Sequence, residues 1–314
     1  MQDIIEAVDR QLLKGELTPD KFVRKTNNVS RDIYIVTHHD SPNTMLEIGR
    51  LREISFREAG GGTGKEADID SYDTAEKPFK QLIVWDSEDE EVVGGYRYLE
   101  GYNIPVNENN VPLSATSKLF HFSDKFVHDY LRKTIELGRS FVQPKYQPTI
   151  DRKKGLYSLD NLWDGLGSLV ADNPDIEYFF GKFTMYPSFD RYARDVILYF
   201  LSKYFYDQEE LVRPYHPLGL YHKTEELESI FRYESYEEDY KKMVQVVRSR
   251  GESIPPLVNS YMNLSSTMKV FGTSLNPNFG NVEETAILIV LEDIYPGKKN
   301  RYITNYKGNN EKRH

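Results

Sequence analysis

Glu136 and Arg139 are charged side chains within a segment whose other residues are typical of a β-strand. Residues 134–142 are rich in β-branched and apolar types, and Pro144 follows their end. Burying an unpaired charge is costly, so each of the two must meet the other, water or a ligand. Strict alternation would place them on opposite faces, but a β-bulge at Gly138 would bring both to one side. From these residues alone, a ligand site and a structural ion pair both stay open.

A glycine-rich segment, residues 60–65, has the composition of a phosphate-binding loop without its spacing. Glu66 stands where serine or threonine should bind magnesium, and the segment follows a predicted helix instead of opening one. We therefore interpret it as a flexible lid or a substrate loop. Asp68, Asp70 and Asp73 come directly after it, and a solvated acidic loop is the favoured interpretation of these three residues.

The composition narrows the class of protein. A chain of 314 residues and 36.6 kDa can bury a large core. The sequence has no cysteine, which excludes disulfides and thiolate sites, and the adjacent His38 and His39 make poor metal partners, so we expect no metal cofactor. A net charge of −9 argues against general nucleic-acid binding. No apolar run reaches a membrane span and no signal peptide is expected, which predicts a soluble, cytoplasmic protein.

Strands and helices in mixed order must position the charged residues. We predict strands at residues 33–37, 81–86, 91–99, 134–142, 178–185 and 285–291, and helices at 1–13, 42–56, 158–171, 188–205 (capped by Ser188), 222–249 and 255–262. In helix 42–56, Met45, Ile48 and Leu51 form the buried stripe. The hairpin order predicts an α+β domain with a mixed sheet. Residues 1–30 are an N-terminal helical extension, 31–296 the main domain with an elaboration from about 207, and 297–314 a polar, frayed tail.

Several motifs occur in the order that a known family has. They are residues 51–57 (LREISFR), 81–86 (QLIVWD), 93–97 (VGGYR), 136–142 (ELGRSFV), 162–166 (LWDGL), 254–261 (IPPLVNSY) and 276–280 (NPNFG). Together they resemble the GNAT-fold N-acyltransferases of ornithine-lipid and glycine-lipid synthesis, often labelled hemolysin-like, over roughly residues 30–293. The 60–65 loop and the aromatic 178–186 segment are most similar to the glycine-lipid branch of Bacteroides-type bacteria. Acyl-homoserine-lactone synthases are more distant relatives.

The resemblance implies a GNAT fold with splayed central strands and flanking helices. It implies transfer of a 3-hydroxyacyl chain from acyl carrier protein to the α-amine of an amino acid, in amino-acyl lipid synthesis. Glycine is the favoured acceptor and ornithine the second. The donor's phosphopantetheine thioester is a substrate, so no cofactor is expected, and peripheral contact with the inner membrane stays open.

The resemblance also gives roles to individual residues. Glu136 accepts the amine's proton, directly or through water, and Arg139 orients Glu136 or grips the pantetheine. Arg97 holds the acceptor's carboxylate. The remaining substrate-binding residues are Arg52, Phe56, Asp70 and Asp73. The competing interpretation of Arg97 and Arg139 is buried ion pairing with Glu136, Asp70 or Asp73.

An acidic carrier protein requires a basic docking patch. The candidates bracket the 134–142 strand and are Arg132, Lys133, Arg152, Lys153 and Lys154. Solvated surface lysines are the commoner explanation for any one of them. The acyl tail needs an apolar groove, for which the aromatic strands and the 188–205 helix are candidates, although ordinary core is favoured for those aromatics.

Three other functions compete with this one. An acetyl-CoA-dependent N-acetyltransferase would need a pyrophosphate loop after the 134–142 strand, where residues 144–148 (PKYQP) stand instead. Autoinducer synthesis would need S-adenosylmethionine. A non-enzymatic, hemolysin-like membrane protein would need a basic amphipathic helix, and none is evident.

Overall fold

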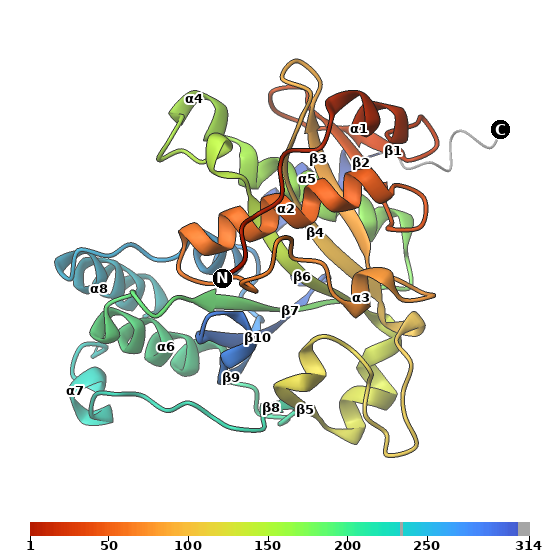
Figure 1. The fold of residues 1–314 in the computed structure, drawn as a ribbon. Coiled ribbons are helices and arrows are strands. Elements are labelled where there is room, and N and C mark those ends of the chain that lie inside the picture. The colour runs from red at the N-terminus through yellow and green to blue at the C-terminus, as the bar shows by residue number, and fades with distance from the viewer. Residues whose placement is uncertain (233–234, 307–314) are drawn as a thin grey trace. The chain divides into compact units, whose positions relative to one another are not determined.

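The chain folds into two compact units in a computed structural model that describes residues 1–232 and 235–306 (Figure 1). The first unit consists of residues 1–104, 132–177 and the C-terminal segment from residue 295. The second consists of residues 105–131 and 178–294. Each unit has its own strands and helices. The boundaries predicted at residues 30 and 296 remain predictions.

The strands of the first unit follow one another in the order β1-β2-β3-β4-β6, and each neighbouring pair is antiparallel. Their bounds are Phe22–Lys25 (β1), Asp32–Val36 (β2), Lys80–Asp86 (β3), Glu91–Glu100 (β4) and Thr134–Val142 (β6). The predicted hairpin is β3 and β4. The interior of β3 is buried along its whole length, as expected of a strand covered on both faces.

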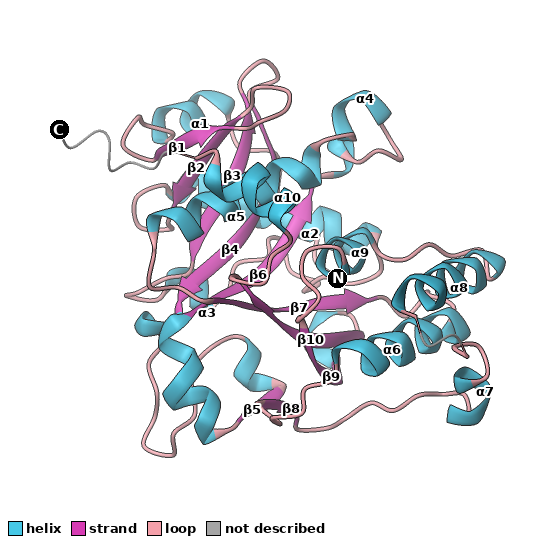
Figure 2. Ribbon diagram, turned by 180° about the vertical axis from the view of Figure 1, so that it is seen from behind, coloured by secondary structure: helices cyan, strands magenta, loops and turns pink. Residues whose placement is uncertain are grey.

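Two long helices cover the faces of this sheet. Figures 1 and 2 show α2 (Pro42–Glu58) on one face and α5 (Ser158–Asp172) on the other. The predicted stripe of α2 is confirmed, since Met45, Ile48 and Leu51 are buried. The unit also contains the short helices α1 (Arg10–Glu16), α3 (Ser71–Thr74), α4 (Arg152–Gly155) and α10 (Pro296–Lys299), and single turns at Gly101–Asn103, Pro144–Tyr146 and Asn300–Thr304. Another single turn, Leu131–Lys133, begins at the last residue of a second-unit segment.

The adjacent Gly94 and Gly95 in β4 are required by the neighbouring strands. A Cβ added at Gly94 would lie 2.4 Å from the carbonyl oxygen of Phe141, and one at Gly95 would lie 2.7 Å from that of Leu82. Both distances are too short for real atoms. These glycines therefore allow the backbones of β6 and β3 to approach β4 closely.

The second unit contains the strands β7 (Tyr178–Met185), β10 (Val282–Val290) and β9 (Lys269–Asn276), antiparallel in that order. A separate antiparallel pair consists of β5 (Phe120–Phe122) and β8 (Val212–Pro214). The helices are α6 (Arg191–Phe205), α7 (Thr224–Glu228), α8 (Tyr236–Ser249) and α9 (Pro256–Met262), with single turns at Thr116–Lys118, Phe126–Tyr130 and Pro277–Phe279. The α+β class is confirmed.

The N-terminal helix predicted over residues 1–13 is wrong in its bounds, because only Arg10–Glu16 is helical. The residues before it bond to the glycine-rich loop region instead of to one another. Gln2 N donates to Gly64 O (2.8 Å) and Ile5 N donates to Glu66 O (3.1 Å). An apolar helical period does not reveal such a long-range partner.

Three further predictions are wrong in detail. The predicted helix 222–249 is two helices, α7 and α8. Helix α6 begins at Arg191, and its cap is Asp190, whose Oδ1 accepts from Ala193 N (2.9 Å), instead of Ser188. The tail is helical from Pro296 to Thr304, with Tyr302 buried, while 307–314 lie outside the described residues. Strands β1, β5, β8 and β9 were not predicted.

Candidate functional site

The predicted bulge in β6 is present, but the unusual backbone is one residue beyond the glycine. Arg97 of β4 lies opposite Gly138 while Gly95 lies opposite Phe141, so β6 carries one extra residue. Arg139 has a φ of 50°, which non-glycine residues rarely adopt and which costs roughly 1–3 kcal/mol. Such strain at a charged residue is typical of a functional site.

The segment that faces this bulge folds around two aspartates. Asp70 caps α3, since its Oδ1 accepts from Tyr72 N (2.9 Å) and Asp73 N (3.3 Å). Asp73 Oδ2 accepts in return from Asp70 N (3.2 Å), which completes a capping box. The same carboxylates remain available to cations. A local motif of the sequence thus fixes the positions of both.

Arginines from two strands meet these aspartates. Arg97 Nη1 lies 2.9 Å from Asp70 Oδ2 and 3.2 Å from Asp73 Oδ2. Arg139 Nε lies 2.7 Å from Asp68 Oδ2, and its Nη2 lies 3.9 Å from Asp70 Oδ2. Asp68 and Asp73 are fully buried, so the solvated acidic loop that we favoured is wrong. The ion pairing that competed with a binding role for Arg97 and Arg139 is present with the aspartates.

Arg52 completes the cluster from helix α2. Its side chain is 0% exposed, its Nη1 lies 3.4 Å from both oxygens of Asp73, and its Nη2 donates to Gln81 Oε1. Gln81 Nε2 donates in turn to Asp73 Oδ1 (3.0 Å). Phe56, one turn along α2, is also buried. Sequence reasoning missed Gln81, although a polar residue opening an apolar strand was a usable signal.

Two charges of this cluster, those of Asp70 and Arg97, stabilise each other. Burial outweighs the nearby carboxylates at Arg52 and lowers the pKa of its guanidinium. Burial would raise the pKa of the Asp70 carboxyl, but the charge and hydrogen bond of Arg97 outweigh it and lower that pKa to about 2. Burial opposes the charge of Arg97, yet the nearby carboxylates of Asp73, Asp70 and Asp68 raise its pKa. Asp70 is therefore ionised throughout the neutral range.

Asp70 is expected to make the protein sensitive to acid. Its pKa is about 2 in the folded protein and 3.8 for an unperturbed aspartate, so its stabilising contribution is present above 3.8 and is lost as the pH falls toward 2. Unfolding by urea, measured from neutral pH downward, should show that Asp70→Asn loses about 2 kcal/mol less stability over this interval than the native protein does. Parallel curves for the two proteins would contradict this expectation.

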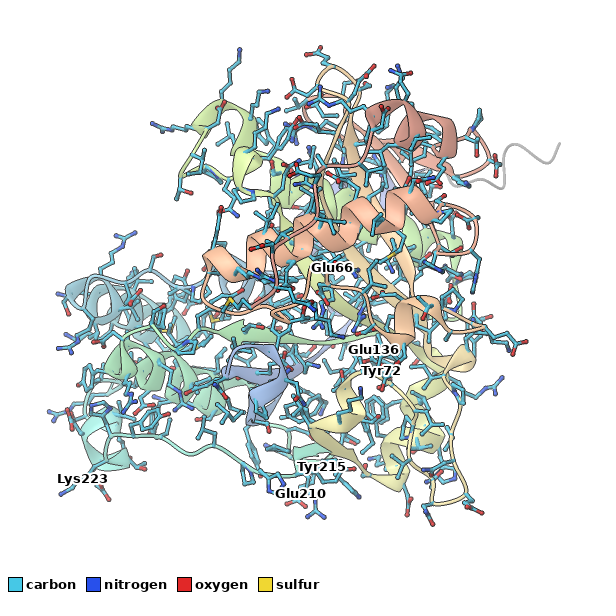
Figure 3. All side chains as sticks on the ribbon, in the orientation of Figure 1. Glu66, Tyr72, Glu136, Glu210, Tyr215 and Lys223 are labelled. Carbon is cyan, nitrogen blue, oxygen red and sulfur yellow. The ribbon has the colours of Figure 1, made fainter. Side chains whose placement is uncertain are left out.

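Glu136 lies beside Tyr72. Glu136 is 3% exposed. Glu136 and Tyr72 of α3 are both labelled in Figure 3. Burial and the negative charge of Glu136 raise the pKa of the Tyr72 phenol. The guanidinium of Arg97 lies over the rings of Tyr72 (6.0 Å) and Phe79 (5.1 Å). Glu136 and Arg139 thus both face the segment that carries Asp68 to Asp73. Tyr72 was missed, since nothing distinguishes it among 23 tyrosines.

The glycine-rich loop is anchored, which corrects our expectation of a flexible lid. The buried carboxylate of Glu53 accepts from Thr63 N (3.0 Å), Thr63 Oγ1 (2.7 Å) and Gly64 N (2.7 Å). Arg57 bonds to Glu53 (2.7 Å) and to the carbonyl of Lys65. A phosphate would find the loop's amides at Thr63 and Gly64 already bonded to a carboxylate.

The basic docking candidates fall into two groups at opposite ends of β6. Arg132 and Lys133 precede the nine-residue strand, which spans roughly 30 Å, and α4 follows beyond its other end. Lys133 pairs with Glu177. Lys154 pairs with Asp89, whereas Arg152 and Lys153 are exposed. The five cations do not form one continuous patch.

Neither a metal site nor a membrane-spanning helix is found within residues 1–232 and 235–306. This part of the chain contains no cluster of histidine and carboxylate ligands suited to a metal ion. Its helices include none that is long and apolar enough to cross a membrane.

Comparison with known proteins identifies the family of the chain. Residues 51–150 match the family model described as an acetyltransferase (GNAT) domain. The chain is 55% identical over 306 residues to a glycine N(alpha)-acyltransferase of Bacteroides thetaiotaomicron, covering 98% of this chain and 91% of that one. A glycine N(alpha)-acyltransferase of Phocaeicola vulgatus is 52% identical over 306 residues, with 98% and 94% covered.

A solved structure is also similar. It is a CoA-dependent acyl-homoserine lactone synthase, BjaI, with 14% identity and a TM-score of 0.40, covering 89% of this chain and 90% of that one. Residues 51–150, which match the family's domain, include the end of α2 from Leu51 and the whole of α3, β3, β4 and β6, the elements that carry the charged cluster. The GNAT fold that the sequence motifs predicted is confirmed.

Proposed function

This chain belongs to the glycine N-acyltransferase family and is an acyltransferase, and we propose that it joins an acyl chain to the α-amine of glycine. The observation that carries the proposal is the identity of 52–55% over nearly the full chain. The direct test is incubation of the purified protein with a 3-hydroxyacyl carrier protein and either glycine or ornithine. Mass spectrometry should detect acylglycine, and acylornithine to a smaller extent. Absence of any acyl-amino acid with both acceptors would refute the proposal.

Aminolysis of a thioester requires a neutral amine, so a base must take a proton from the acceptor's ammonium. Glu136 is the proposed base, directly or through one water. The amine nitrogen then bonds to the thioester carbon, the carbon–sulfur bond breaks, and the thiol leaves with a proton. The position of Glu136 supports this role, since it is only 3% exposed, lies near Tyr72 and is on the same strand as Arg139.

Asp70 and Arg139 are the proposed contacts of the acceptor or of the pantetheine arm. Of the cluster's arginines, Arg139 has the most exposed side chain (18%), against 3% for Arg97 and 0% for Arg52. Asp70 has the most exposed carboxylate among Asp68, Asp70 and Asp73. An ionised Asp70 would attract an ammonium group, and a guanidinium suits a carboxylate.

Arg97, Arg52, Phe56 and Asp73 then have a positioning role in the proposal. Arg97 was expected to hold the acceptor's carboxylate, but its Nη1 already contacts two aspartates. A buried Arg52 bonded to Asp73 and Gln81 is better suited to holding Asp73 than to touching substrate. Phe56 lies on the same helix and is also buried.

The donor is proposed to be an acyl carrier protein, in a pathway of amino-acyl lipid synthesis. Pro144–Tyr146, a single 3₁₀ turn, follows β6, and α4 after it has only four residues. A pyrophosphate-binding loop would instead lead directly into a long helix, whose N-terminus holds the anion. A carrier-borne phosphopantetheine has no adenosine pyrophosphate to bind. Faster turnover with acyl-CoA than with the acyl carrier protein would contradict this choice of donor.

The docking of an acidic carrier is expected at α4. The double variant Arg152→Glu/Lys153→Glu should raise the KM for the acyl carrier protein roughly tenfold with little change in kcat, because exposed charges act mainly on association. The difference should shrink at high salt. Arg132→Glu/Lys133→Glu, the same charge change before β6, is the matched comparison. Unchanged KM in the first variant would refute docking at α4.

A further inference from the structure

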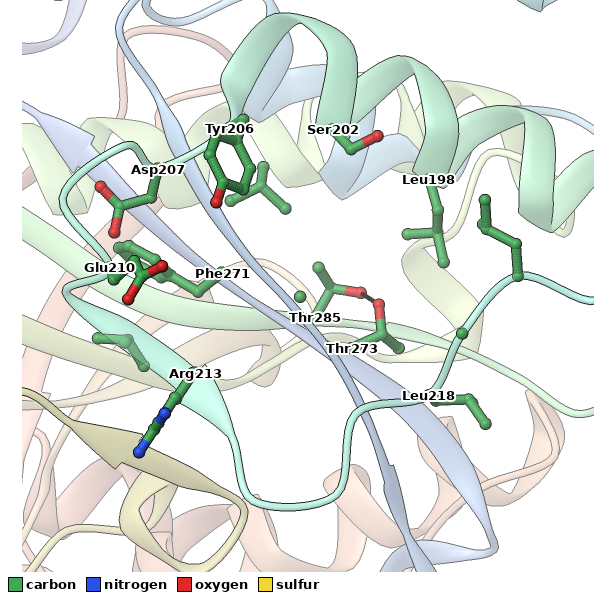
Figure 4. Close-up of a pocket in the computed structure, with 15 residues that line it drawn as sticks. Leu198, Ser202, Tyr206, Asp207, Glu210, Arg213, Leu218, Phe271, Thr273 and Thr285 are labelled. Atoms are coloured by element: carbon green, nitrogen blue, oxygen red, sulfur yellow. Dashed lines mark hydrogen bonds between the residues drawn. The ribbon is translucent and has the colours of Figure 1, made fainter. Parts of the chain in front are cut away.

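The second unit contains a cavity of about 450 Å³, within the range of small-molecule sites. Figure 4 shows it bounded by helix α6, the segment 206–220 and strand β9. The segment is held to β9 by Leu218 N, which donates to Thr273 O (2.8 Å). All of these elements lie in one unit.

Most of the cavity wall is apolar. Leu198 of α6, Val212 of β8, and Val270 and Phe271 of β9 line it, and all four are largely buried. Charged residues, among them Asp207 and Arg213, lie in Figure 4 toward the end opposite Leu198 and Leu218. A wall of this kind suits an aliphatic chain whose polar end remains near the charged residues.

Two hydroxyl groups interrupt the apolar wall. Thr273 of β9 and Thr285 of β10 are cross-strand partners, and their Oγ1 atoms are 2.8 Å apart. They are 5% and 1% exposed. One hydroxyl must donate to the other, which leaves the second hydroxyl's hydrogen with no acceptor among the described residues. A buried donor without an acceptor is unfavourable, so an oxygen of a ligand would complete the pair.

We propose that this cavity binds a long aliphatic chain that carries a hydroxyl or carbonyl oxygen, with that oxygen at the Thr273–Thr285 pair. Two sources have this chemistry, namely the acyl group of the donor and a free oxygenated fatty acid. Assignment to the donor's acyl group rests on the proposed function. The binding itself does not depend on it.

The first experiment measures binding to the full chain, with 3-hydroxyhexadecanoic acid and hexadecanoic acid as probes in calorimetry. Leu198→Trp, which fills the cavity, should weaken binding of both acids at least about tenfold. Thr273→Val/Thr285→Val removes both hydroxyls without changing shape, so only the hydroxy acid should bind about tenfold more weakly. Leu275→Trp, on the same strand and 44% exposed, is the control and should change neither affinity.

Thermal unfolding establishes that each variant is folded. A second variant that fills the cavity is Ser202→Phe, one turn along the helix from Leu198. Unchanged affinities in both filling variants would overturn the proposal. Equal loss of both acids in the double valine variant would overturn the role of the threonine pair.

The second experiment distinguishes the two sources. If the donor's acyl group occupies the cavity, Leu198→Trp should shift turnover toward shorter acyl donors. If the occupant is a separate fatty acid, chain-length preference should stay unchanged while acid binding is lost, and the cavity proposal stands. Acid binding without turnover of any donor would refute the proposed function and leave the cavity site intact.

Discussion

Glu136→Gln is expected to lower turnover by a factor of about 10²–10⁴, the usual contribution of a general base. Glutamine has the shape of glutamate but accepts no proton at neutral pH. The amine of glycine would then lose its proton only to solvent. The measurement is kcat for acylglycine formation by mass spectrometry, with melting temperature as the check on folding.

The matched control is Glu100→Gln, a buried carboxylate on β4 outside the arginine–aspartate cluster, paired with Lys80. Glu100→Gln should retain kcat within about threefold, which would show that the loss of a buried carboxylate does not by itself lower turnover. Full activity in Glu136→Gln would remove Glu136 from the mechanism.

Arg52→Met is expected to lower the free energy of unfolding by about 3–5 kcal/mol, because it leaves three buried or half-buried aspartates with two arginines. Asp73 would keep Arg97 and Gln81 but lose its contact from α2. Against a total stability of roughly 5–15 kcal/mol, this loss should be visible in urea unfolding curves at neutral pH.

Arg50→Met, on the same helix, is the control for Arg52→Met. Arg50 pairs with Glu47 three residues away and remains 17% exposed, so its loss should cost less than the loss of the fully buried Arg52. Methionine and arginine have similar helix propensities, and the difference between the two variants therefore reports the buried pair. Equal free energies of unfolding for Arg50→Met and Arg52→Met would show that the buried ion pair of Arg52 does not stabilise the fold more than the pair of Arg50.

Local patterns account for the elements that could be predicted. The helical stripe of α2 and the apolar run of β3 depend on periods of 3.6 and 2 that the residues themselves display. Where prediction failed, a distant partner decided the conformation. The segment before α1 bonds to the glycine-rich loop, and β9 contains Gly272 with a φ of 90°, which interrupts alternation.

The sequence predicted which residues belong to the site better than it predicted which of them are in contact. Family motifs indicated Glu136, Arg139, Arg97 and Arg52, and the structure brings the three arginines to the aspartates of one short segment. The motifs did not indicate that Asp68 is fully buried, since its spacing predicts a solvated loop. Burial depends on what packs above a residue, and that is absent from any local pattern.

The sequence by itself indicated the strands and the helix that carry the glutamate and the arginines, Gly138 as a place for a bulge, and the family to which the chain is similar, because these depend on residue types and their spacing. Only the tertiary structure decided which charges meet. Asp70 and Asp73 lie 24 to 27 residues from Arg97 and well over 60 from Arg139, and pairing across such separations follows from how the sheet and α3 pack. It also placed the strained φ at Arg139 instead of Gly138, since the partner strand fixes where the extra residue falls.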